Sequence, residues 1–117
     1  LLIAAKKILT MGPKYLIIKK GEHGAILFGE DKMFYSPAVM LENVIDPTGA
    51  GDSFAGGFIG YLAKTKEITF DNMKKAVVYG TVLASFTVEK LGIESIENIE
   101  EEKVNKRLAK IRSVVSF

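Results

Sequence analysis

Residues 46–58 read DPTGAGDSFAGGF, and this segment contains the strongest functional signal in the chain. The small residues at positions 49–51 allow the backbone to turn sharply, so that several N–H groups can point toward one place. Apolar residues recur at helical intervals from Phe54 onward, which predicts a helix that begins near Gly51. The first N–H groups of a helix lack partners within it, and its positive end attracts negative charge. The pattern therefore predicts an anion hole at the start of this helix.

Asp52 lies beside the predicted anion hole. A carboxylate there opposes the binding of phosphate unless it has a chemical role. The natural role is that of a general base, which takes a proton from a hydroxyl while that hydroxyl attacks a phosphorus atom held over the hole. The structural alternative is a tight turn in which Asp52 only complements the helix dipole. The tetrapeptide Gly-Ala-Gly-Asp alone leaves both interpretations open.

Three other motifs can be tested on the same residues. A P-loop requires a lysine where Gly57 stands, and a dinucleotide fingerprint requires a third glycine where Phe54 stands. A serine hydrolase with Ser53 as nucleophile is a further alternative. In α/β hydrolases the catalytic histidine follows the serine, whereas His23, the only histidine, precedes Ser53. The P-loop and the dinucleotide fingerprint are excluded, and the hydrolase is disfavoured.

The composition of the 117 residues narrows the classes of function further. The chain has 16 Lys and Arg against 14 Asp and Glu, and a net charge of +2 argues against a dedicated nucleic-acid-binding protein. The absence of cysteine excludes disulfide and iron–sulfur scaffolds and fits a cytoplasmic protein. No apolar run approaches the roughly 20 residues that cross a bilayer. We therefore expect neither a nucleic-acid nor a membrane partner.

Apolar runs bounded by glycine and proline divide the rest of the chain into short elements. The predicted elements are a helix over residues 1–11, strands over residues 15–18, 25–28 and 33–35, and further helices over residues 71–89 and 99–112. Asp71 is the predicted N-cap of the helix over residues 71–89. The spacing of Gly56 and Gly60 predicts close approach of a neighbouring element. A strand hairpin followed by helices is typical of the α/β class.

Residues 46–59 resemble the C-terminal signature of the ribokinase-like, or PfkB-type, carbohydrate kinases. The resemblance extends to the glycine turn at residues 19–25 and to the helix over residues 71–89. It implies the C-terminal part of a mostly parallel sheet flanked by helices, with a strand hairpin near the N-terminus. Residues 1–117 are then a single partial domain, the ATP-binding part of such a kinase.

The resemblance also implies an activity and the residues that perform it. The implied reaction transfers the γ-phosphate of ATP to a sugar or nucleoside hydroxyl, with Mg²⁺, and Asp52 is the general base. The implied anion hole consists of the backbone N–H groups of Gly49, Ala50, Gly51 and Asp52. The implied nucleotide contacts are Lys20, Gly21, Gly24, Tyr79 and Gly80. In many members of the family, oxygens at the positions of Asp46 and Thr48 help to bind a monovalent cation such as K⁺.

The family's N-terminal portion, with most of the sugar contacts, has no counterpart in these 117 residues. An alternative function is therefore a fragment that binds nucleotide or phosphate without catalysis. An α/β sheet divided in this way exposes apolar faces and an unpaired edge, which favours a homodimer.

Overall fold

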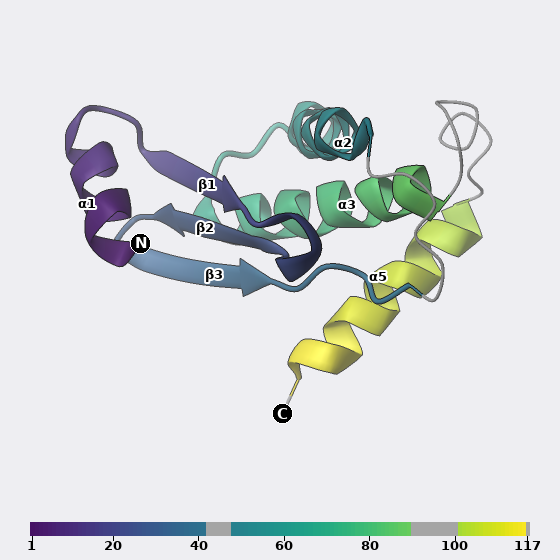
Figure 1. The fold of residues 1–117 in the computed structure, drawn as a ribbon. Coiled ribbons are helices and arrows are strands. Elements are labelled where there is room, and N and C mark those ends of the chain that lie inside the picture. Colours follow the sequence, from purple (N-terminus) through teal and green to yellow (C-terminus); the bar gives the residue numbers. More distant parts are fainter. Residues whose placement is uncertain (42–47, 90–100, 117) are drawn as a thin grey trace.

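The computed structural model describes residues 1–41, 48–89 and 101–116 of the chain (Figure 1). The elements are, in order, α1 (Leu2–Thr10), β1 (Tyr15–Lys19), the short 3₁₀ helix η1 (Gly21–His23), β2 (Ala25–Gly29), β3 (Lys32–Ser36), α2 (Ala50–Thr65), α3 (Phe70–Glu89) and α5 (Glu101–Val115). The predicted strands and helices are therefore present, with ends displaced by a few residues. The predicted start of the last helix at residue 99 lies outside the described residues.

The three strands form one antiparallel sheet in the order β1-β2-β3. Gly29 pairs with Lys32, so that β2 and β3 are joined by a two-residue turn at Glu30 and Asp31. Both turn residues have positive φ, 51° and 59°, as expected for a tight hairpin turn whose twist matches that of the strands. The predicted hairpin is confirmed. Every strand pair within the described ranges is antiparallel, so the parallel part of the expected sheet has no counterpart there.

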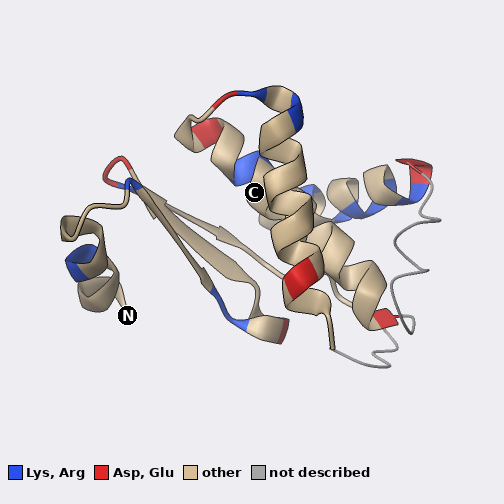
Figure 2. Cartoon of the chain, turned by 90° about the horizontal axis from the view of Figure 1, so that it is seen from above, with Lys and Arg blue, Asp and Glu red and all other residues tan. Residues whose placement is uncertain are grey.

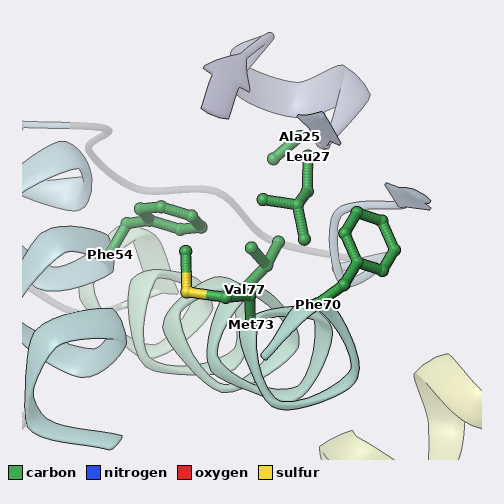
Figure 3. Close-up of a cluster of buried hydrophobic side chains, with 6 residues drawn as sticks. All are labelled: Ala25, Leu27, Phe54, Phe70, Met73 and Val77. Carbon is green, nitrogen blue, oxygen red and sulfur yellow. The ribbon is translucent and has the colours of Figure 1, made fainter. Parts of the chain in front are cut away.

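The core forms where β2, α2 and α3 meet (Figure 3). α3 crosses one face of the sheet, and α2 packs alongside α3 (Figure 1). The side chains of this cluster are Ala25 and Leu27 from β2, Phe54 from α2, and Phe70, Met73 and Val77 from α3. Because Phe54 follows the first turn of α2, the same packing that builds the core also positions the start of that helix.

Two glycines allow α2 and α3 to approach each other closely. A Cβ added to Gly80 would lie 2.7 Å from the backbone oxygen of Phe54, and one added to Gly57 would lie 3.1 Å from the Cα of Gly80. The expectation for Gly56 and Gly60 is wrong, because an added Cβ at either position meets nothing within 4 Å. The close approach of the two helices is made by Gly57 of α2 and Gly80 of α3.

The start of α3 is capped by side chains from two places. The N–H of Phe70 donates to Glu30 Oε2 at 3.0 Å, and the N–H of Asn72 donates to Thr69 Oγ1 at 3.2 Å. The N-cap is therefore Thr69, and the prediction of Asp71 is wrong by two residues. Glu30 comes from the β2–β3 turn, so this cap also joins the helix to the sheet.

α5 covers a second face of α3. Val82 and Phe86 of α3 are buried against Val104 and Ile111 of α5. The guanidinium of Arg107 stacks on the Phe86 ring, 3.8 Å from its centroid. None of the helices in the described ranges is both long enough and apolar enough to span a bilayer.

Candidate functional site

A cavity of about 680 Å³ opens between the end of β1, the η1 turn and helices α2 and α3. Its walls are mainly apolar, with Val39, Phe54, Ala84 and Val88 among the lining residues. Lys19 contributes a charged group at the end of β1. An apolar cavity of this size with a few polar groups is typical of a small-molecule site.

The first turn of α2 forms one edge of this cavity. Gly49 precedes the helix in the left-handed conformation, with φ of 85°, and its carbonyl accepts the first helical hydrogen bond from the N–H of Ser53 at 3.0 Å. The N–H groups of residues 49–52 therefore have no partner within the helix. Within the described ranges no side chain caps them. Ala50 and Gly51 line the cavity, so the uncapped amides lie at its edge.

Asp52 lies in this first turn with an exposed side chain. Its carboxylate forms no hydrogen bond or ion pair with the residues that the structure describes. Charged residues are sparse along α2, which has Asp52 near its start and Lys64 near its end (Figure 2). The predicted base is thus open to solvent and beside the uncapped amides, and its catalytic role remains a prediction.

Lys19 is a site residue that the sequence interpretation missed. Its Nζ lies 5.4 Å from the centroid of the Phe54 ring and 3.2 Å from the position that a Cβ on Gly51 would occupy. An ammonium next to a helix start adds to the positive potential there, which favours an anionic ligand. Lys20, the predicted contact, is exposed and does not line the cavity. Strand alternation could have identified Lys19, because it shares a strand face with the core residue Ile17.

The η1 turn places two predicted glycines on the cavity. Gly21 and Gly24 both line it, together with Glu22, which was not predicted. Gly24 has φ of 91°, and an added Cβ would lie 2.1 Å from the backbone oxygen of Ser36. Only glycine fits there, so the turn is held close against the end of β3.

Tyr79 and Gly80, the other predicted nucleotide contacts, do not line the cavity. The Tyr79 ring lies 5.6 Å from that of Tyr61, centroid to centroid, and Gly80 packs against the backbone of Phe54. The residues of α3 that line the cavity are Thr81, Ala84, Ser85 and Val88. These four residues lie on one face of α3, and that face begins at the residue after Gly80.

The described residues do not support the predicted cation site or the alternative of a serine hydrolase. Asp46 lies outside the described residues, and Thr48 is exposed just before α2. The Ser53 hydroxyl lies 2.6 Å from the hydroxyl of Thr87, whereas His23 pairs with Glu22 on an exposed turn, with 3.6 Å between Nε2 and Oε1. In the described structure, Ser53 and His23 therefore do not form a nucleophile–base pair.

Comparison with known proteins identifies the family of the chain. Residues 1–99 match the family described as pfkB family carbohydrate kinase. The chain is 37% identical over 98 residues to a nucleoside kinase of Methanocaldococcus jannaschii, a match that covers 83% of this chain and 30% of the relative. It is 34% identical over 92 residues to a deoxyribokinase of Salmonella typhi, covering 79% and 28% of the two chains. The chain belongs to the pfkB family.

Solved structures show the same fold. The ribokinase of Thermotoga maritima superimposes with a TM-score of 0.74 at 32% identity, over 92% of this chain and 34% of that one. The crystal structure of the M. jannaschii nucleoside kinase, a member of the ribokinase family, gives a TM-score of 0.65 over 83% of this chain and 30% of its own. The fold class is therefore α/β and ribokinase-like. The chain spans about a third of the length of these relatives.

Proposed function

We propose that the chain supplies the phosphate-donor side of a kinase that transfers the γ-phosphate of ATP to a hydroxyl of a sugar or nucleoside. The observation that carries the proposal is the uncapped first turn of α2, which opens on an apolar cavity and contains the exposed carboxylate of Asp52. Relatives named nucleoside kinase, deoxyribokinase and ribokinase support this class of reaction. A structure of a related kinase is described as a complex with aminoimidazole riboside and an ATP analogue.

The residues fit a nucleotide with its phosphates at the start of α2. The apolar walls of the cavity suit a base, and the amides of residues 49–52 suit the transferred phosphoryl group. The ammonium of Lys19 adds positive charge at the junction between these two regions. Preorganised donors of this kind stabilise charge without reorganisation during the reaction.

Asp52 is the general base in this proposal. The acceptor hydroxyl gives its proton to the Asp52 carboxylate while its oxygen forms a bond to the γ-phosphorus. The bond from that phosphorus to the bridging oxygen breaks, and ADP leaves with the electron pair. The exposed position of Asp52 leaves room for an acceptor on the solvent side of α2.

Mg²⁺ neutralises phosphate charge in phosphoryl transfer. The described residues contain no group of three His, Asp or Glu side chains that could hold a metal ion. An Mg²⁺ ion held largely by the nucleotide's own phosphates needs only one or two carboxylates, so Mg²⁺ stays part of the proposal. K⁺ at Asp46 and Thr48 remains a proposal, since Asp46 lies outside the described residues.

The proposal is tested by Asp52→Asn in the intact protein. We expect kcat to fall by about 10²–10⁴-fold, because the amide cannot accept the proton, while KM for ATP changes by less than about threefold. Asp71→Asn is the matched control, because Asp71 is also an acid in the first turn of a helix, on α3. Near-normal turnover of Asp52→Asn in a steady-state assay would refute the assignment of the base.

A second candidate function is nucleotide binding without catalysis. It is favoured by the apolar cavity beside the uncapped amides of α2, because these features suit a nucleotide whether or not an acceptor is present. Calorimetry with ATP measures binding to the 117-residue chain, and an assay for ADP release measures turnover. Binding without release supports this candidate for the chain alone.

A further inference from the structure

We infer that Thr87 of α3 is a positioning residue for the proposed phosphate transfer, because its hydroxyl holds the first turn of α2 in place. The inference rests on the proposed function and extends it to a residue outside the glycine-rich segment. The carrying observation is the contact between Ser53 Oγ and Thr87 Oγ1, which are 2.6 Å apart. Thr87 is 6% exposed, so water does not compete with this hydrogen bond.

The first turn of α2 needs to be stabilised, but a side-chain cap would block its amides, and the hydrogen bond to Thr87 stabilises the turn without blocking them. A side-chain N-cap normally satisfies the first amides of a helix and stabilises its first turn. At α2 such a cap would occupy the amides that the proposed function requires to be free. Gly49 supplies no cap, and the described residues supply none from elsewhere. The hydroxyl of Thr87 anchors the turn through a side chain instead, and leaves the amides open.

Thr87 bonds one end of the turn and lies beside the other. Its hydroxyl bonds Ser53, the first residue whose N–H enters the helical ladder, and its Cγ2 lies 3.6 Å from the position of an added Cβ on Gly49. Successive helical side chains diverge by about 100°. With Ser53 directed to α3, the adjacent Asp52 is directed away from it and into solvent. The same hydrogen bond therefore sets the direction of the proposed base and of the amides.

The test compares Thr87→Val with Thr87→Ser in the intact protein. Valine keeps the shape and removes the hydroxyl, whereas serine keeps the hydroxyl. We expect Thr87→Val to lower kcat by roughly tenfold, because small misplacements of reacting groups cost at least that much, with an unchanged KM for the acceptor. We expect Thr87→Ser to stay within about twofold of the wild type. Ser53→Ala should reproduce the loss, and Ser53→Ala with Thr87→Val should not be additive.

Thr65→Val is the matched control at the other end of α2. Thr65 Oγ1 accepts a hydrogen bond from Asn72 Nδ2 at 2.7 Å, so this variant also removes a hydroxyl that joins α2 to α3. Thr65 is the last residue of α2, more than three helical turns from Ser53, and this variant should lower thermal stability without lowering kcat.

The outcomes separate the inference from the proposed function. A wild-type protein without kinase activity would refute the proposed function itself. Wild-type activity with a normal kcat in folded Thr87→Val would overturn the inference, and so would an equal loss of kcat in Thr65→Val. If Thr87→Val does not fold, as judged by circular dichroism, Ser53→Ala decides: normal kcat in that variant would also overturn the inference.

Discussion

The two helices that form the core begin in opposite ways. At the start of α3, the N–H groups of Phe70 and Asn72 donate to the side chains of Glu30 and Thr69. At the start of α2, no described side chain accepts from the first amides. A carboxylate therefore neutralises the positive end of α3. Beside the start of α2 lie the ammonium of Lys19 and the exposed carboxylate of Asp52, and neither occupies the first amides of that helix.

This difference follows from where the first amides of each helix lie, buried in the core for α3 and beside the cavity for α2. Phe70 is 4% exposed and belongs to the core, so its amide must find a protein acceptor. Gly51 lines a cavity, so its amide can bind a ligand instead. We therefore propose that the start of α3 contributes to stability and the start of α2 to binding. The predictions below test this division.

Within this comparison of helix starts, the largest effect is expected from filling the uncapped start of α2. Gly51→Val places a branched side chain where the amides face the cavity, and should lower kcat/KM for ATP by about 10²-fold. The fold should tolerate the change, since the nearest atom to an added Cβ is the flexible end of Lys19.

Asp71→Val is the control for this change, because Asp71 holds the same position in the first turn of α3. It should leave kcat/KM within about twofold. Equal losses in the two variants, measured by steady-state kinetics, would contradict the division between the helix starts.

A smaller effect is expected from removing the side-chain cap at the start of α3. Glu30→Ala removes the acceptor for the Phe70 N–H and should lower the free energy of unfolding by about 1–2 kcal/mol, with an unchanged kcat. Asp31→Ala is the control, since Asp31 shares the turn, the exposure and the positive φ but accepts no hydrogen bond from the start of α3 in the described structure. Urea unfolding monitored by circular dichroism measures both. Equal stability of the two variants would show that the cap contributes nothing.

The smallest effect concerns the pH dependence of the same cap. Tyr15 donates a hydrogen bond to the Glu30 carboxylate, and this bond, with burial and the negative charge of Glu30, raises the pKa of Tyr15 above its ordinary value of 10.0. A raised pKa means that folding favours the protonated phenol. The contribution is complete below the ordinary pKa and is lost as the pH rises through the raised value.

Tyr15→Phe tests this pH dependence. The difference in melting temperature between wild type and variant should be constant at neutral pH and should shrink at alkaline pH. A difference that is the same at neutral pH and above about pH 11 would show that the phenol does not act through this bond.

Local pattern predicted the elements that short-range chemistry determines. Glycine and proline bound the strands, and the helical spacing that starts at Phe54 placed the beginning of α2 within one residue. The segment containing Asp52 also indicated the family that the comparisons show. These features depend on residues close together in the chain.

Features that depend on contacts between residues far apart in the chain could not be predicted from the local sequence pattern. The contact of Glu30 with the N–H of Phe70 spans 40 residues, so no local pattern shows it, whereas Thr69 is a local N-cap that the prediction missed by two positions. α3 is buried both toward the sheet and toward α5, where Val82 and Phe86 pack, and the contact with α5 depends on residues far along the chain. The cavity face of α3 likewise depends on how that helix rotates against α2.

The most direct test of the account is nuclear magnetic resonance of the backbone amides during titration of the intact protein with ATP and, separately, with adenosine. Adenosine can fill the cavity but has no phosphate. If the start of α2 holds the phosphates, the amide signals of residues 49–52 shift with ATP and much less with adenosine, while those of Phe70 and Asn72 move with neither. Binding of ATP that leaves the signals of residues 49–52 in place, or no binding at all, would contradict it.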